Sequence, residues 1–272
     1  MGNQIFKKYR QPRRTMSITK AQGIIKELNI QNINDLNLKL IAAYYNILVV
    51  PRILTGMDGS LLRNNNEAII TVNKSIREIG RTRFVIAHEL GHYFLHPDTR
   101  QFDIFKERDI YQWAYKNNPE ELEANIFAAE LLMPDSLFEP CIRGEEPNFN
   151  LVSNLANQFH TTFTATAIRL VKLIKEPCAL VASENLRRKW FIINDLFEFR
   201  LKEDESIHES TCATEIHAGE TSASRDDKIS AGAWLQDFDD SLKDCITEDS
   251  IALGNYGLIL SLLWIKDTIQ KE

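Results

Sequence analysis

The stretch RTRFVIAHELGHYFLH (residues 81–96) decides the fold, because it joins an apolar helical stripe to an HExxH motif. Phe84 and Leu95 follow the 3.6-residue period of an α-helix, and His88 and His92 lie on the same stripe. Residues four apart lie one turn, or ~6 Å, apart on one helix face, so two imidazoles there can bind one ion. The pattern predicts a buried helix that presents a histidine pair to a metal.

The glutamate of the motif has a different predicted role. Glu89 projects about 100° around the helix from His88, so its carboxylate lies beside the metal rather than on it. There it can take a proton from a water that the metal activates. The alternative is two core histidines without an ion. We favour the metal site, because two imidazoles and a carboxylate are costly to bury without a partner.

A third ligand is predicted on a second helix, NPEELEANIFAAELLMP (residues 118–134). Glu121 continues the apolar face of this helix and would complete a His-His-Glu site. Asn125, one turn further on, is expected to hydrogen-bond a ligating histidine. His96 is excluded as a third ligand, because it lies about 12 Å along the axis from His88.

Two alternatives for the third ligand stay open in the sequence. Asn118 is a typical N-cap and Pro119 a typical first helical residue, which places Glu121 at the capping-box position. Glu121 then serves the helix end instead of a metal. Glu123 is the alternative ligand, although it points elsewhere on the helix.

The two motifs together resemble the ImmA/IrrE family of zinc-dependent peptidases. The resemblance rests on residues 81–96 and 121–134, and it extends to AIITVN (68–73) and to NLVSNLANQFHTTFTATAIRLVKL (150–173). It covers roughly residues 20–175. Each motif alone is weak, but the pair is specific.

The resemblance implies a role for each of four residues. In the family, the positions of His88, His92 and Glu121 bind one zinc ion, and the position of Glu89 is the general base. We therefore expect one Zn²⁺, with Mn²⁺ as the alternative metal. The family also implies a metalloendopeptidase that cleaves a regulatory protein, such as a helix-turn-helix repressor or an antitoxin. Cleavage would relieve repression in a mobile element or a stress response.

The order of elements predicts an α+β fold. The family resemblance adds that a zincin-like peptidase core, with a small mixed sheet and the HExxH helix, is followed by a helix-turn-helix-like segment and a separate C-terminal α+β region. The expected domains are a basic flexible arm (residues 1–19), the peptidase core (20–148), the helical segment (149–176) and an acidic domain of unknown role (177–272).

Local patterns place the expected elements. Pro51 suggests an edge position for a strand over 47–54. The other expected elements are helices in 17–45, a hairpin over 61–72, a helix from about 80 to 95, a second from about 118 to 133, two short helices in 149–175, a strand over 189–193 and a polar loop over 203–228.

Composition sets the broad class. The 272 residues carry a net charge of −6, with 44% hydrophobic residues, which is ordinary for a globular protein. The four cysteines form no CxxC pair, so neither a disulfide framework nor a zinc knuckle is expected. No long apolar stretch suggests a signal or a membrane span, so we expect a cytoplasmic protein.

Charge is unevenly spread along the chain. Residues 1–20 hold six basic residues and no acid, whereas residues 201–250 hold fourteen acids and four bases. A basic arm can contact nucleic acid phosphates, so a DNA-binding protein is one alternative class. We expect no direct nucleic acid binding, because the acidic stretch opposes it. The second alternative is a non-catalytic, zinc-stabilised regulator that binds a repressor or toxin partner.

Substrate contacts are less defined in the sequence. A strand from residues 61–73 is expected to pair with an extended substrate backbone. An oxyanion-stabilising residue is expected but not identified. The candidates for this role are Tyr93, Tyr111, Tyr115 and His160.

Overall fold

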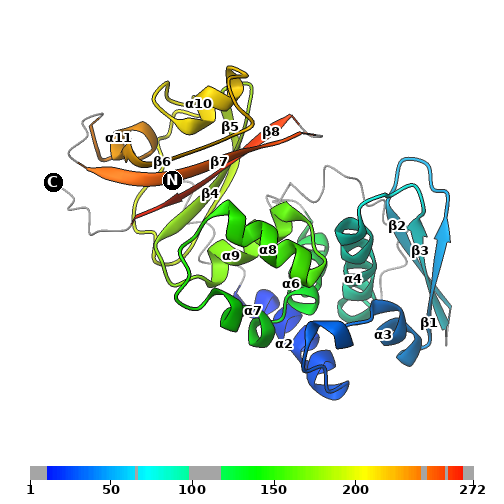
Figure 1. Ribbon diagram of the computed structural model, residues 1–272. Coiled ribbons are helices and arrows are strands. Elements are labelled where there is room, and N and C mark those ends of the chain that lie inside the picture. The colour runs from blue at the N-terminus through cyan, green and yellow to red at the C-terminus, as the bar shows by residue number, and fades with distance from the viewer. Residues whose placement is uncertain (1–10, 65–66, 98–117, 240–243, 255–256, 266–272) are drawn as a thin grey trace. The chain divides into compact units, whose positions relative to one another are not determined.

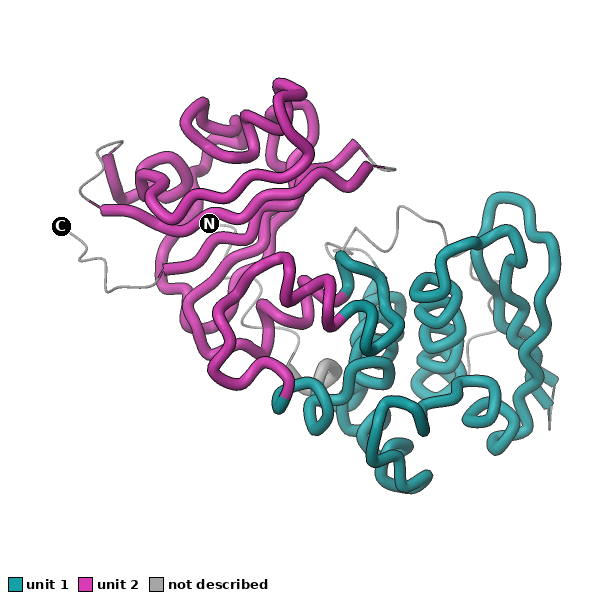
Figure 2. The backbone as a smooth tube through the Cα atoms, in the orientation of Figure 1, with its two compact units in different colours: residues 1–140, 156–165 teal, residues 141–155, 166–272 magenta. Residues whose placement is uncertain are grey.

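The computed structural model describes residues 11–64, 67–97, 118–239, 244–254 and 257–265. They form a mixed α+β structure, which confirms the predicted class. The chain divides into two compact units, unit 1 with residues 1–140 and 156–165, and unit 2 with residues 141–155 and 166–272 (Figure 2). This division differs from the domain boundaries expected at residues 148 and 176.

Unit 1 contains a small mixed sheet whose strands alternate between buried and exposed positions. Its strand order is β1-β3-β2, with β1 parallel and β2 antiparallel to β3. Ala68, Ile70 and Val72 of β3 are buried, so one face of the sheet contacts the core. Pro51 lies on the outer strand β1, as expected. The strands are β1 (Ile47–Arg52), β2 (Gly59–Asn64) and β3 (Glu67–Asn73).

The helices of unit 1 place the HExxH motif between two layers. Helix α4 lies between the sheet and α6 (Figure 1). Both predicted helices are confirmed, and Asn118 caps α6 as its N-cap residue. The helices are α2 (Gln11–Glu27), α3 (Leu38–Tyr44), α4 (Ile79–Leu95) and α6 (Pro119–Leu132), with a 3-10 helix η1 (Ile33–Asp35).

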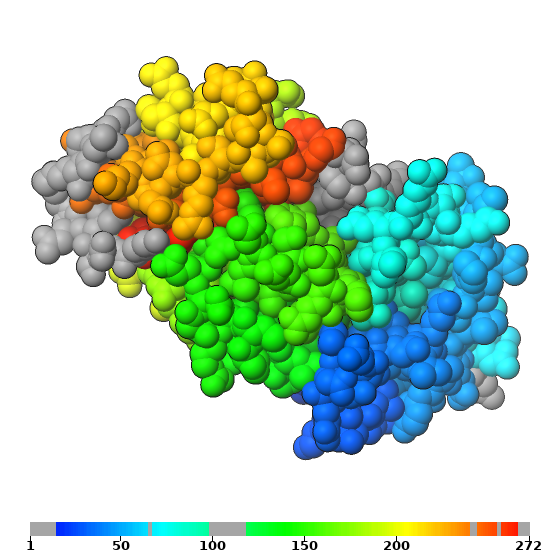
Figure 3. Space-filling model, viewed as in Figure 1, coloured from blue at the N-terminus to red at the C-terminus, as the bar shows by residue number. Residues whose placement is uncertain are grey.

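Three short helices follow α6, and the green surface of Figure 3 includes the exposed residues of α7 and α8, whereas α9 has no exposed residue. Helices α8 and α9 confirm the two helices expected in 149–175, joined by residues 160–162. Their helix-turn-helix character stays a prediction. Helix α7 was not expected, because Pro134 marked the end of a helix and Pro140 lies inside the next one. The three helices are α7 (Asp135–Ile142), α8 (Phe149–Phe159) and α9 (Phe163–Leu173).

Unit 2 contains a five-stranded antiparallel sheet in the order β5-β4-β8-β7-β6. Phe197, Trp234 and Leu263 belong to its apolar core. Its elements are β4 (Cys178–Glu184), β5 (Arg187–Ile193), α10 (Cys212–His217), β6 (Ala223–Ser230), α11 (Ala231–Trp234), β7 (Cys245–Leu253) and β8 (Leu258–Trp264).

Two expectations about polar segments need correction. The polar loop expected over 203–228 instead contains α10 and most of β6. Strand β6 lies at the sheet edge and most of its residues are exposed, so its composition resembles a loop. The basic arm expected over 1–19 differs as well, because α2 begins at Gln11. Residues 1–10 lie outside the described residues.

Among the described residues, no helix is both long and apolar enough to cross a bilayer.

Candidate metal centre

Three side chains from two helices converge in unit 1. His88 and His92 of α4 and Glu121 of α6 bring one ligand atom each to within 4.8 Å of one another. The two histidine Nε2 atoms are 2.9 Å apart. Glu121 Oε2 lies 3.1 Å from His88 Nε2, and Glu121 Oε1 lies 3.2 Å from His92 Nε2. In the described part of the chain, this is the one such cluster of histidine, cysteine and acidic side chains.

The donor set fits a small divalent ion. Ligand atoms at 2.0–2.1 Å from a tetrahedral ion lie about 3.3 Å from one another, close to the separations observed here. Two imidazole nitrogens and a carboxylate oxygen are also ligands that zinc prefers. With three protein donors, a tetrahedral ion keeps one position open for water or substrate.

Asn125 defines which nitrogen of His88 faces the cluster. His88 Nδ1–H donates to Asn125 Oδ1 at 2.9 Å, and both side chains are buried. In a neutral His88 ring this contact keeps the proton on Nδ1, which leaves the Nε2 lone pair available to a metal ion. The arrangement supports the role predicted for Asn125.

The electrostatics of Glu121 agree with an ionised ligand. Burial raises the pKa of this carboxyl group, but hydrogen bonds and charge from His88 and His92 outweigh burial and hold the pKa well below its ordinary value. Glu121 thus remains a carboxylate over the physiological range of pH.

Glu121 and Glu123, the alternatives for the third ligand, have different neighbours in the structure. Asn118 Oδ1 accepts from the Glu120 amide at 3.2 Å, so capping occurs as the alternative requires. The Glu121 carboxylate nevertheless faces the two histidines. Glu123 points to His96 instead, with Oε2 3.7 Å from His96 Nε2.

Glu89 is fully buried on α4 and does not belong to the three-donor cluster. Strand β2 approaches it at Gly59. A β-carbon at Gly59 would lie 2.4 Å from Val85 Cγ1 and 3.2 Å from Glu89 Oε1. Only glycine permits this close approach, so the backbone of β2 passes directly beside the carboxylate.

Two contacts attach β2 to α4, and sequence patterns pointed to neither. Asp58, just before β2, accepts a hydrogen bond from Arg81 Nε at 3.0 Å. Arg63 Nη2 donates to the His92 carbonyl at 2.6 Å, and its guanidinium lies 4.8 Å from the centre of the Tyr93 ring. Such pairs join residues far apart in sequence, and no local motif predicts them. They hold β2 along the length of the motif helix.

The candidates for oxyanion stabilisation are only partly described. Tyr93 packs beneath Arg63 next to the motif. His160 is exposed in the turn after α8, with φ at 52°. Neither belongs to the three-donor cluster. Tyr111 and Tyr115 lie outside the described residues.

With this geometry in place, comparison with known proteins identifies the family. Residues 42–171 match the peptidase M78 family model, described as the IrrE N-terminal-like domain. The chain belongs to the ImmA/IrrE family. This ImmA/IrrE chain is therefore a member of a metallopeptidase family, and its core has the zincin-like fold expected from the sequence.

Two curated relatives of the ImmA/IrrE chain agree. Immunity region protein 2 of Bacillus phage phi105 is 34% identical over 116 residues, which span 42% of this chain and 66% of that protein. Metallopeptidase ImmA of Bacillus subtilis (strain 168) is 28% identical over 130 residues, which span 46% of this chain and 69% of that protein. The chain thus matches about two thirds of the length of each relative.

A solved structure extends the likeness of the ImmA/IrrE chain to its fold. A Mycobacterium tuberculosis transcriptional regulator aligns with a TM-score of 0.60 and 13% identity, over 92% of this chain and 76% of that one. At this identity the likeness concerns the fold alone.

Proposed function

We propose that the chain is a metal-dependent endopeptidase that cleaves a specific regulatory protein, such as a helix-turn-helix repressor or an antitoxin. Cleavage would relieve repression in a mobile element or a stress response. The observation that carries this proposal is the convergence of His88, His92 and Glu121, with Glu89 beside them on α4. The names of the two relatives, a phage immunity region protein and metallopeptidase ImmA, support it.

Each residue at the centre has a distinct task in this proposal. His88, His92 and Glu121 hold the ion, and zinc suits two imidazoles and one carboxylate, with manganese as the alternative. A divalent ion, when bound there, supplies Lewis acidity to a carbonyl and lowers the pKa of a water. Asn125 keeps the His88 ring in the tautomer that directs Nε2 at the ion.

Glu89 acts first as the general base and then as the general acid of the reaction. Its carboxylate takes a proton from the water that attacks the scissile carbonyl. The same carboxyl group then gives that proton to the leaving amine, so it ends the cycle ionised as it began. Because Glu89 adjoins His88 in the sequence, one helix positions the base and a ligand together.

Strand β2 offers a place for the substrate backbone. Among the described strands, β2 pairs only with β3, which leaves its other edge for an extended segment. An added strand would gain main-chain hydrogen bonds, and side-chain pockets would then select the sequence. Gly59 would bring such a strand next to Glu89.

Co-expression with a neighbouring repressor, followed by mass spectrometry of the fragments, tests the proposal. Wild type and the Glu139→Gln control, an exposed glutamate of α7, should cut the repressor at one site. Glu89→Gln should retain the metal and lose the cut. Normal cleavage by Glu89→Gln would contradict the mechanism. A metal-loaded wild type that holds the repressor intact would favour the non-catalytic regulator.

A further inference from the structure

Unit 1 contains a pocket that shares no residue with the metal centre. It has a volume of about 470 Å³ and lies among η1, the start of α3, the first turns of α4 and the turn after α8. Four basic side chains line it, and we call it the basic pocket: Lys39, Arg77, Arg83 and His160.

Among the described residues, no carboxylate balances the charges of the basic pocket. None of its lining residues is acidic. No carboxylate in the described part of the chain forms an ion pair with Lys39, Arg77 or Arg83. By contrast, Arg81, two residues before Arg83 on α4, pairs with Asp58. The described lining of the basic pocket therefore carries a net positive charge, which an anionic partner would complement.

Among the lining residues, Arg83 gives the strongest indication that the basic pocket binds an anion. Its guanidinium is half-buried, and burial lowers its pKa. Nη1 and Nη2 donate to the Leu36 carbonyl over a long 3.4 Å, and the buried Nε has no hydrogen-bond partner. Withdrawing a charge from water without a counter-ion is unfavourable, so an anion in the pocket would relieve this cost.

The first turn of α4 adds to the positive field. Ile79 and Thr82 line the pocket, and this is the positive end of the helix dipole. Residue Glu78 occupies the N-cap position but makes no side-chain hydrogen bond to the cap. The first-turn amides are thus without the usual side-chain acceptor.

The remaining lining is aliphatic and partly exposed. Ile79 is 70% exposed at the rim, whereas Leu36, Leu38 and Ile86 are buried at the base. A ligand for this surface must carry an apolar group next to its negative charges. Small-molecule sites bury most of their ligand, whereas these exposed rim residues suit a segment of a larger partner that covers them from its own side.

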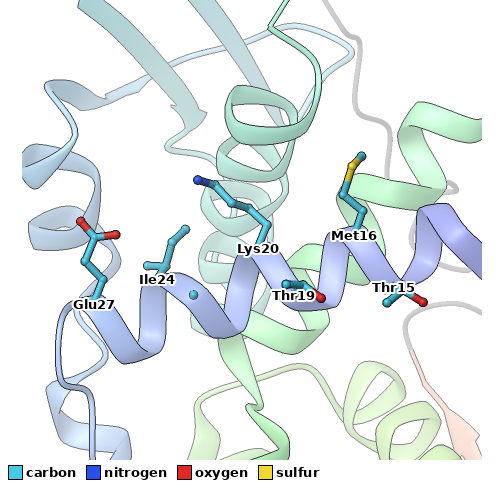
Figure 4. A pocket seen from close by; sticks show the side chains of 7 residues that line it. Thr15, Met16, Thr19, Lys20, Ile24 and Glu27 are labelled. Carbon is cyan, nitrogen blue, oxygen red and sulfur yellow. The ribbon is translucent and has the colours of Figure 1, made fainter.

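A second pocket of unit 1 differs from the basic pocket, because it contains side chains of both charges. The pocket along α2 has a volume of about 510 Å³, and Lys20 and Glu27 line it (Figure 4). Lys20 Nζ lies 4.7 Å from the centre of the Phe94 ring, and Glu27 accepts a hydrogen bond from the Tyr45 hydroxyl at 2.9 Å. Lys20 and Glu27 thus each contact an aromatic side chain, whereas Lys39, Arg77 and Arg83 have no carboxylate partner among the described residues.

We infer that the basic pocket docks an acidic segment of the protein substrate, in which an aliphatic side chain lies between carboxylates. The inference rests on the proposed function, since the occupant is the substrate. Docking at Arg83 would hold the substrate on the helix that carries the metal ligands, about 7.5 Å along the axis from His88. The pocket would then add selectivity for acidic partners away from the scissile bond.

Fluorescence anisotropy with the full chain tests docking without any need for cleavage. The probe is a labelled Asp-Glu-Leu-Asp-Glu peptide at low salt, and the uncharged control peptide is Asn-Gln-Leu-Asn-Gln. The acidic peptide should bind, and the Arg77→Gln/Arg83→Gln variant should bind it at least about tenfold more weakly. The matched control, Arg52→Gln/Lys74→Gln, removes two exposed charges outside the pocket and should bind like wild type.

Three results with the peptides would overturn the docking inference. They are equal binding of the two peptides, an equal loss in the control variant, and wild-type affinity in the Arg77→Gln/Arg83→Gln variant. Equally tight binding of free 4-methylpentanoate would also overturn it, by assigning the pocket to a small carboxylate. Circular dichroism and metal content should match wild type in every variant. Because binding is measured without turnover, peptide binding by an inactive chain would contradict the proposed function alone.

Discussion

Gly91 of α4 lies directly against Ala124 of α6, where a β-carbon at Gly91 would be 2.9 Å from Ala124 Cα. Gly91 precedes the proposed ligand His92, and Ala124 follows the proposed ligand Glu121 by three positions. The close approach of the two helices therefore sets the distance between the histidine pair and the carboxylate. The metal centre depends on a helix–helix contact that only a residue without a side chain permits.

Gly91→Ala should force α6 away from α4. The neighbour is backbone, which cannot rotate aside, so we expect a loss of about 1–2 kcal/mol in the free energy of unfolding. Metal affinity should fall with it, because Glu121 moves with α6. Urea unfolding and metal titration measure the two effects.

Gly23→Ala is the matched control for this prediction. Gly23 also lies within a helix, α2, but nothing lies within 4 Å of a β-carbon there. This substitution should stabilise the chain by about 0.5–1 kcal/mol, because alanine favours a helix. Similar effects of the two substitutions would contradict the role of the Gly91 contact.

Glu121→Gln should remove metal from the purified chain. The neutral amide is a poor ligand and leaves only two histidine donors. Glu123→Gln, two residues away on the same helix and facing His96, should keep one ion per chain. Elemental analysis after dialysis measures both stoichiometries. Metal lost from Glu123→Gln and retained by Glu121→Gln would reverse the assignment.

Asn125→Ala should lower metal affinity without removing a ligand. The His88 ring loses the acceptor that fixes its tautomer, and loss of such a partner typically weakens metal binding about 10–100-fold. Asn154→Ala, an exposed asparagine of α8, should leave the affinity unchanged. Competition with a chromogenic chelator measures both, and equal affinities would count against the orienting role.

Glu248 should make the stability of unit 2 depend on pH. Burial raises the pKa of this carboxyl group, although hydrogen bonds from Trp234, Ser250 and two backbone amides lower it in part. The folded state then holds the proton more tightly than the unfolded state. The stabilising contribution is full below the ordinary pKa of about 4.3 and is lost as pH rises through the folded value.

The Glu248→Gln variant isolates this effect, because glutamine does not titrate. The free energy of unfolding of wild type relative to the variant should fall as pH rises from about 4, by up to roughly 1 kcal/mol per pH unit. Urea unfolding followed by tryptophan fluorescence reports on this region, which contains Trp234. A difference that is constant or grows with pH would rule out the linkage.

Much of the candidate site could be predicted because its signals are local. Helix α4 follows from one apolar period, and α6 follows from Asn118 and Pro119 at its start. The ligand spacing in α4 follows from helix geometry alone. Glu121 joined the site only as a candidate, because the sequence does not show which face of α6 meets α4.

The sequence did not predict the contacts between elements that are far apart in the chain. Gly59 beside Glu89, and Arg63 on the His92 carbonyl, depend on how β2 packs against α4. Helix α7 was hidden by Pro140, and β6 by charges on an exposed sheet edge. In each case tertiary packing outweighs a local preference that points elsewhere.

X-ray absorption at the zinc edge tests the central claim that α4 and α6 together build one metal site. The purified chain should bind one equivalent of zinc. The spectrum should show a four-coordinate ion with two imidazole nitrogens at about 2.0–2.1 Å, completed by oxygen ligands. Glu121→Gln should lose this signal. A zinc ion bound by sulfur at about 2.3 Å, or an unchanged spectrum in Glu121→Gln, would contradict the account.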